Sequence, residues 1–217
     1  MVLTHLVTIG DSWPAGAELQ NLKDSFPSLL ADHLELESIN LSQSATSTDQ
    51  ALHRLLHVTE NIKWDKTLIL FCLSGISRSM YIDDQPREIH PTSGTPIANV
   101  YYKYIHSDEL DRFNRIRNIL SAQHYSNVVG SRILFVNNWD KTPEHCAIDQ
   151  TLFYNKTLTE ILDIDQKLDD ADLNWYNLSK HKFISPNQWH PNVFGHSLIA
   201  KELGIWIKEK LNDKSLS

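Results

Sequence analysis

Apolar runs that alternate with helical periodicities constrain the fold of this chain more than any other feature of its sequence. Residues 6–9, 66–73 and 131–138 form short, strand-like runs, and the second is almost wholly apolar. A strand without polar alternation is typical of the centre of a parallel sheet, where both faces are buried. Apolar residues recur with helical spacing at 24–34 and 108–123. Strands alternating with helices predict a three-layer α/β/α fold around a parallel sheet.

The remaining elements extend this sheet to five strands. We expect a second strand at 38–42, a helix at 48–60, a helical stretch at 152–168, a short fifth strand at 181–184 and a last helix at 193–211. The spacing of these elements leaves the order of the strands open.

Residues 77–105 break the alternation. Three prolines and a glycine interrupt a polar, aromatic-containing stretch without a clear period. Loops of this length inside a compact domain are usually lids or binding loops. We therefore expect one domain over residues 1–212, with a long loop insertion at about 77–105 and a flexible tail at 213–217.

Composition argues against several classes of partner. The formal net charge is −7 and no basic cluster is present, which disfavours nucleic acid and anionic membranes. No apolar stretch is long enough to span a bilayer, and no signal peptide precedes the first strand-like run, so we expect a cytoplasmic protein. Cys72 and Cys146 are expected to be reduced, and no pair of histidines makes a convincing metal site.

The first apolar run ends abruptly at Gly10-Asp11-Ser12, and Pro14 and Gly16 follow. A serine at the carboxyl end of a parallel strand lies where open α/β sheets bind their ligands. If a helix begins there, its free N–H groups favour developing negative charge. Ser12 is therefore a candidate nucleophile. The alternative is that Asp11 and Ser12 only cap a helix.

A second polar cluster, SPNQWHPNVFGH, occupies residues 185–196. Together the two ends of the chain resemble the SGNH (GDSL-type) hydrolase superfamily. In that family a Gly-Asp-Ser nucleophile opens the chain, and an Asp-x-x-His segment, often continuing as His-Pro-Asn-x-x-Gly-His, closes it. The resemblance spans nearly the whole chain and implies a flavodoxin-like, five-stranded parallel sheet.

The resemblance also implies roles for individual residues. Ser12 corresponds to the nucleophile and His190 to the base that takes its proton. His196 is expected to be structural, at the start of the last helix. In the family the oxyanion is bound by the N–H of the nucleophile and by a glycine N–H after the second strand, where this chain has Ala45. Alanine supplies the same N–H provided that its backbone does not require a positive φ.

Two departures from the family pattern weaken the expected site. The third oxyanion donor, an asparagine of a Gly-x-Asn-Asp motif, is missing, and Ser74, Ser77 or Arg78 is the candidate replacement. The aspartate three residues before the base is Asn187. Asparagine accepts a hydrogen bond but carries no charge, and in serine proteases this change costs roughly 10⁴ in turnover. Another carboxylate or a backbone carbonyl is a possible substitute.

Three further residues lie beside the candidates in sequence. Glu18 is expected either to pair with Arg78 beneath the pocket or to be a solvated or capping residue. Trp13 and Trp189 flank Ser12 and His190, so they form either an aromatic wall for the substrate or part of the core.

The function that these residues favour is a serine-dependent esterase that removes an acyl group, with acetyl as the first candidate, from a carbohydrate or another small ester. It needs no metal and no organic cofactor. The alternative is a catalytically impaired module that binds a carbohydrate or another ligand, because the oxyanion asparagine and the triad aspartate are both missing. A flavodoxin-like nucleotide binder is disfavoured because no Gly-rich phosphate loop is present.

Overall fold

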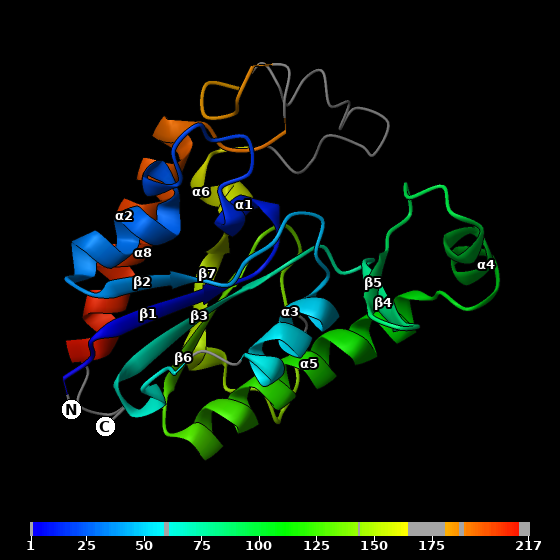
Figure 1. The fold of residues 1–217 in the computed structure, drawn as a ribbon, viewed down its shortest axis with the longest axis horizontal. Coiled ribbons are helices and arrows are strands. Elements are labelled where there is room, and N and C mark those ends of the chain that lie inside the picture. Colours follow the sequence, from blue (N-terminus) through cyan, green and yellow to red (C-terminus); the bar gives the residue numbers. More distant parts are fainter. Residues whose placement is uncertain (1, 59–60, 143, 165–180, 187–188, 213–217) are drawn as a thin grey trace.

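The computed structural model describes residues 2–58, 61–142, 144–164, 181–186 and 189–212. A five-stranded sheet with the order β2-β1-β3-β6-β7 forms its centre (Figure 1). The strands are β1 (His5–Ile9), β2 (Glu37–Asn40), β3 (Thr67–Leu73), β6 (Arg132–Asn137) and β7 (Phe153–Thr157), and every pairing between them is parallel. This order places the second strand outside the first, as in flavodoxin. The predicted fold class is confirmed.

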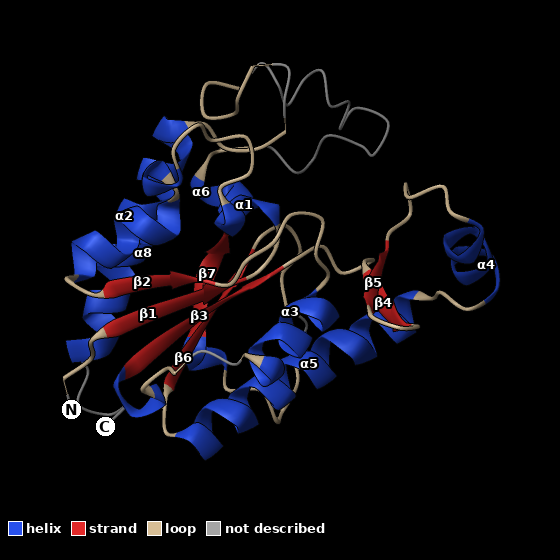
Figure 2. Cartoon of the chain, in the orientation of Figure 1, coloured by secondary structure: helices blue, strands red, loops and turns tan. Residues whose placement is uncertain are grey.

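Helices cover both faces of the sheet (Figure 2). Helices α2 (Phe26–Leu34) and α8 (Val193–Asn212) pack on one face, and α3 (Thr48–His57) and α5 (Asp108–Val129) on the other. Along β3, Leu68, Leu70 and Cys72 join the first core, while Ile69, Phe71 and Leu73 join the second. All seven residues of β3 are buried, which explains its unbroken apolar sequence.

Within the described residues, the predictions of a helix at 152–168 and of a fifth strand at 181–184 were wrong, and residues 165–168 lie outside that part of the chain. The fifth strand is β7, and within the described residues the helical part after it is the short α6 (Leu158–Ile161). β7 is an edge strand, so Asn155 and Lys156 are exposed, while Phe153 stacks on Phe135 with ring centroids 4.8 Å apart. Of residues 181–184, only Ile184 makes a β-bridge, with Pro191.

The sequence predicted a long loop at about residues 77–105, and this prediction was wrong. These residues contain an antiparallel hairpin of β4 (Ser79–Ile82) and β5 (Pro86–Ile89), and then α4 (Pro96–Tyr104), all set apart from the central sheet in Figure 1. Proline is tolerated at the start of a strand and in the first turn of a helix, so Pro86 and Pro96 mark the starts of β5 and α4, while Pro91 lies in the loop between them. Tyr102 donates a hydrogen bond to the Ser77 carbonyl at 2.6 Å and ties α4 back to the start of the segment.

Among the described residues, no helix combines the length and the apolar character needed to cross a membrane. Cys72 is buried, Cys146 is exposed, and neither forms a disulfide.

Candidate active site

The turn after β1 holds Ser12 at the carboxyl edge of the sheet. Ser12 is the first residue of α1 (Ser12–Ala15), and Asp11 is its N-cap. The Asp11 Oδ1 accepts hydrogen bonds from the Trp13 N–H at 3.2 Å and from Asn138 Nδ2 at 2.6 Å. Asp11 thus caps the helix as one of the two sequence readings proposed, while Ser12 is left 8% exposed at its end.

His190 lies in a loop that hydrogen bonds hold in place at residue 190 and at the residues that follow it. The Ser185 N–H donates to the His190 carbonyl at 2.9 Å, and Asn192 Nδ2 donates to the Lys182 carbonyl at 2.9 Å. The Asn192 Oδ1 accepts from the Gly195 N–H at 3.0 Å, at the start of α8. A side chain at Gly195 would place Cβ only 2.5 Å from the Phe183 carbonyl oxygen, so the loop packs on α8 because of this glycine.

His196 is structural, as expected. It is fully buried, and its Nδ1 accepts a hydrogen bond at 3.1 Å from the N–H of Phe26, the first residue of α2. Burial lowers the pKa of His196 to about 3, which keeps the ring neutral.

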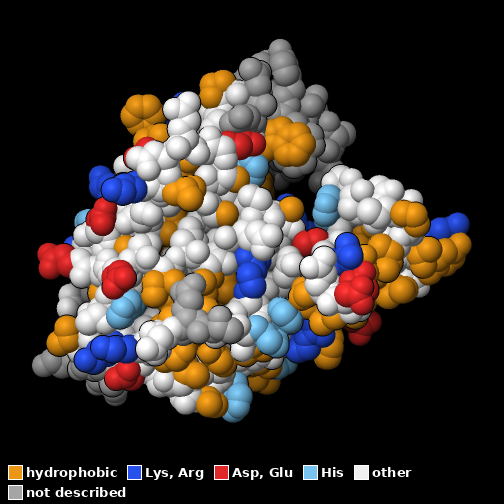
Figure 3. Space-filling view, in the orientation of Figure 1, with side chains coloured by type: hydrophobic (Ala, Val, Ile, Leu, Met, Phe, Trp, Pro, Cys, Tyr) orange, Lys and Arg blue, Asp and Glu red, His pale blue; other side chains and the backbone are white. Residues whose placement is uncertain are grey.

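Ser12 and His190 line one cavity of about 360 Å³. Four segments supply its walls: the turn after β1, the loop after β2, the 77–105 segment and the loop before α8. The lining residues are Ser12, Ser44, Ala45, Ser77, Arg78, His90, Pro91, Thr92, Trp189 and His190. Figure 3 shows the surface indented between the central body and the part that carries α4. The two ends of the chain therefore meet at one site.

Glu18 lies beside the His190 ring, on the Nδ1 side. Its Oε1 lies 2.8 Å from Nδ1 of His190, with the two side chains 27% and 18% exposed. Nδ1 has no partner at hydrogen-bonding angles, so this is a close contact in which the carboxylate oxygen is off the direction of an N–H bond. Of the sequence-based alternatives for Glu18, the pair with Arg78 was wrong, whereas the solvated residue fits, since Glu18 is partly exposed.

Arg78 instead faces Asp11. Its Nη1 lies 3.7 Å from Asp11 Oδ2, and Asp11 is buried while Arg78 is 30% exposed. Burial raises the pKa of Asp11, and the Arg78 guanidinium opposes that shift. The cation on the cavity wall therefore balances the carboxylate that caps α1.

Comparisons with known proteins rest on structure, since no family model and no curated protein matches the sequence. The fold is similar to a psychrotrophic esterase, EstA, from Pseudoalteromonas sp., at 17% identity and a TM-score of 0.53, with 97% of this chain and all of that chain covered. It is also similar to a protein described as lipolytic and of the G-D-S-L family from Desulfitobacterium hafniense, at 12% identity, a TM-score of 0.53, and coverage of 93% and 98%.

A third structure, of a carbohydrate esterase with divergent catalytic and non-catalytic binding functions, matches at 12% identity and a TM-score of 0.54, covering 96% of this chain and 66% of that one. This chain has the SGNH hydrolase fold.

The oxyanion region departs from the SGNH pattern in its backbone as well as its sequence. Ala45 lies on the cavity wall with φ of 60°, in the left-handed region where the family has glycine. The proviso that its backbone avoid a positive φ is therefore not met. Arg54 holds this loop, because its guanidinium donates to the Leu41 carbonyl at 2.8 Å and to Thr46 Oγ1 at 2.7 Å.

The three candidates for the missing SGNH asparagine lie in different places. Ser77 and Arg78 line the cavity. Ser74 is buried and does not line it, because its hydroxyl lies 3.3 Å from Thr48 Oγ1. Asn187, at the position of the family's aspartate, is outside the described residues.

The two tryptophans also separate. Trp189 lines the cavity and is 45% exposed. Trp13 is part of the core, 2% exposed and edge-on to Trp139 with ring centroids 5.0 Å apart. Of the two, only Trp189 is placed to form an aromatic wall.

Several residues of the site carried no recognisable signal in the sequence. His90 and Thr92 line the cavity from the loop after β5, and Asn138 fixes Asp11 from the end of β6. The alternation of strands could have indicated Asn138, because it directly follows a parallel strand at the same edge of the sheet. His90 and Thr92 lie in a segment whose path no local pattern predicts.

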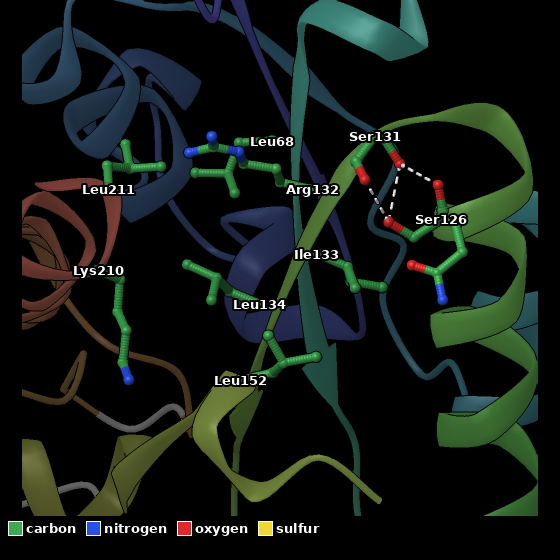
Figure 4. Close-up of a pocket in the computed structure, with 10 residues that line it drawn as sticks. Leu68, Ser126, Ser131, Arg132, Ile133, Leu134, Leu152, Lys210 and Leu211 are labelled. Atoms are coloured by element: carbon green, nitrogen blue, oxygen red, sulfur yellow. Dashed lines mark hydrogen bonds between the residues drawn. The ribbon is translucent and has the colours of Figure 1, made fainter. Parts of the chain in front are cut away.

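A second cavity, of about 200 Å³, lies at the opposite edge of the sheet (Figure 4). Leu68 and Arg132, at the amino ends of β3 and β6, contribute to its wall, and Ser126 and Ser131 bond each other there. Neither Ser12 nor His190 lines it, and no other histidine of the described residues does.

Glu88 on β5 adds a titratable group beneath Arg78. Its Oε1 accepts from the Ser47 N–H at 2.8 Å and from the Ser47 hydroxyl at 3.0 Å, and burial raises its pKa to about 7. Since this pKa exceeds that of the unfolded chain, the folded state retains a proton that the unfolded state loses. The stability of the protein should therefore fall as the pH rises from about 4.5 to about 7.

We expect Glu88→Gln to remove this pH dependence, because glutamine does not titrate. Its amide oxygen still accepts from Ser47, so the local structure should be kept. At pH 8 the variant should be more stable than the wild type, by on the order of 1–2 kcal/mol after allowance for partial solvation. At pH 4.5 the two should be equal. Urea unfolding at both pH values measures the difference, and an equal difference at both would contradict it.

Proposed function

We propose that this protein is a serine-dependent ester hydrolase in which Ser12 is the nucleophile and His190 the base. The observation that carries the proposal is that Ser12, at the carboxyl end of β1, and His190, in the loop before α8, line the same cavity although they are far apart in the chain. The SGNH fold supports it, since the structural neighbours include an esterase and a carbohydrate esterase.

The reaction follows from the side chains at the cavity. The Ser12 oxygen attacks the ester carbonyl carbon, and its proton passes to Nε2 of His190, the ring nitrogen that Glu18 does not contact. His190 then gives that proton to the leaving alcohol as the carbon–oxygen bond of the ester breaks. The same ring then takes a proton from water, whose oxygen attacks the acyl carbon, and returns that proton to the Ser12 oxygen as the bond from Ser12 to the acyl group breaks and the acid leaves.

Two backbone groups are available for the oxyanion. Ser12 is the first residue of α1, and the first N–H groups of a helix have no acceptor within the helix. The Ala45 N–H is the second donor. Arg78, which lines the same cavity, is a cationic candidate for the third position.

The substrate class that this cavity supports is a small or carbohydrate ester with a short acyl group such as acetyl. Trp189 exposes an aromatic side chain at the cavity, and aromatic faces are suitable for the apolar side of a sugar. The polar side chains of Ser44, Ser77 and Thr92 on the other walls match hydroxyl groups of a carbohydrate.

A fluorophosphonate probe tests the nucleophile directly. We expect the wild type to be labelled at Ser12, with the adduct found by peptide mass spectrometry, and Ser12→Ala to be unlabelled. Ser44→Ala is the matched control, because Ser44 is a serine on the wall of the same cavity and should not affect labelling. Labelling that persists in Ser12→Ala, or no labelling of folded wild type, would contradict the proposal.

The second candidate is an SGNH-fold module that binds a carbohydrate without turnover. It is favoured by the position of Ser74, whose hydroxyl faces Thr48 rather than the cavity, so the family's third oxyanion donor has no counterpart there. Saturable binding of a carbohydrate, together with no probe labelling and no ester hydrolysis, would support this candidate over the esterase.

A further inference from the structure

Within the described residues, the carboxylate that contacts His190 comes from an unexpected part of the chain. We propose that Glu18, six residues after the nucleophile, is the positioning residue that fixes and stabilises the His190 ring, in place of the aspartate that the family has three residues before its base. The inference depends on the proposed function, because it assigns Glu18 a role through His190.

The contact has the geometry that this role requires. Glu18 Oε1 is 2.8 Å from Nδ1, and a carboxylate at Nδ1 favours the tautomer that keeps its proton there and leaves Nε2 unprotonated. Catalytic hydrogen bonds are often poorly aligned without substrate and tighten in the complex. Rotation of the ring that aligns the N–H bond with the oxygen would complete the hydrogen bond, since the atoms are already within hydrogen-bonding distance.

The backbone turns sharply to bring Glu18 to this place. Gly16 has φ of 70°, and Glu18 itself has φ of 72°, in the left-handed region that non-glycine residues rarely adopt. The Ala17 N–H donates to the Ser12 carbonyl at 3.0 Å and the Leu19 N–H to the Gly16 carbonyl at 3.1 Å, so the turn is tied to the nucleophile's own helix. Such strained residues cluster at functional sites.

The pairing is specific within the described part of the chain. There, the carboxylate of Glu18 contacts His190 and no other basic side chain within 4 Å, while Arg78 is paired with Asp11. When the ring takes the proton of Ser12 it becomes a cation, and the Glu18 carboxylate stabilises that cation while remaining ionised. Nucleophile and positioning residue thus come from one turn.

The test replaces Glu18 with Gln, which has the same shape and no charge. We expect kcat for p-nitrophenyl acetate to fall about 10- to 100-fold, less than in serine proteases because the pair is partly solvated. KM and Tm should change little, since Glu18 does not line the cavity. Glu35→Gln is the matched control, because Glu35 also has a positive φ, of 57°, and is exposed at the end of α2.

Glu18→Asp provides the rescue, since it restores the charge on a shorter side chain and should recover part of the lost kcat. A Glu18→Gln variant with kcat within twofold of the wild type would overturn the inference. So would equal losses in the Gln and Asp variants, or a loss that follows a lower Tm. If the wild type hydrolyses ester no faster than Ser12→Ala, the proposed function fails, and the role of Glu18 fails with it.

Discussion

Replacing His190 with glutamine should lower kcat for p-nitrophenyl acetate by about 10³- to 10⁴-fold, near the upper end of what a general base contributes. Glutamine is close to histidine in size but does not take a proton from the Ser12 hydroxyl at neutral pH. The loop should keep its place, because it is anchored by the His190 backbone, by Asn192 and by Gly195 rather than by the imidazole. Tm should therefore stay close to that of the wild type.

His90→Gln is the control for this experiment. His90 lines the same cavity as His190, but it comes from the loop after β5, and its side chain bonds Thr92 at 3.1 Å rather than a carboxylate. We expect its kcat to remain within about threefold of the wild type, since most changes away from the reacting groups are small. If His90→Gln loses as much activity as His190→Gln, or His190→Gln retains wild-type kcat, His190 is not the base.

The fold was predictable where burial dominated the sequence. β1, β3 and β6 are buried on both faces, so their apolar runs could only be strands of a covered parallel sheet. β7 was missed because an edge strand tolerates polar residues, and Asn155 and Lys156 concealed it. The hairpin of β4 and β5 was missed for a similar reason, since its strands are short and largely outside the main core.

The residues of the candidate site that lie in family motifs could be predicted from the sequence. The partner of His190 could not, because its position depends on the conformation of a turn. Ser12 and His190 were found from the two ends of the chain. The direction of Glu18 was not, because it depends on the left-handed backbone of Gly16 and of Glu18 itself. No sequence pattern of a glutamate indicates a positive φ, so Arg78 was considered as its partner and His190 was not.

The separation of charges explains how one small site contains two carboxylates near two cationic or basic groups. Asp11 is buried, holds α1 and faces Arg78, whereas Glu18 is partly solvated and faces His190. If Arg78 paired with Glu18 instead, His190 would lack a carboxylate and the buried Asp11 would lack its cation. In the observed arrangement, Asp11 and Arg78 stabilise the turn, and under the proposed function Glu18 and His190 take part in the reaction.

Gly10 lies in tight packing between β1 and the turn that carries Ser12. A Cβ at this position would lie 2.8 Å from Cys72 Cβ, 2.8 Å from Pro14 Cγ and 2.9 Å from the Cys72 carbonyl oxygen. None of these atoms is at the end of a flexible side chain, so the strand β3 or the turn itself would have to move. Only glycine fits between them.

We therefore expect Gly10→Ala to destabilise the protein by about 3 kcal/mol or more, at or above the upper end of typical overpacking. In a chain of this size that lowers Tm by roughly 6–12 °C, measured by circular dichroism. Gly75→Ala is the matched control, because Gly75 follows the neighbouring strand β3 and a Cβ there meets no atom within 4 Å. Its effect should stay within about 0.5 kcal/mol.

Because the same displacement would move Ser12, folded Gly10→Ala should also lose fluorophosphonate labelling while Gly75→Ala keeps it. If the two variants were equally stable, the turn after β1 would have room for a side chain at position 10, and this prediction would be wrong.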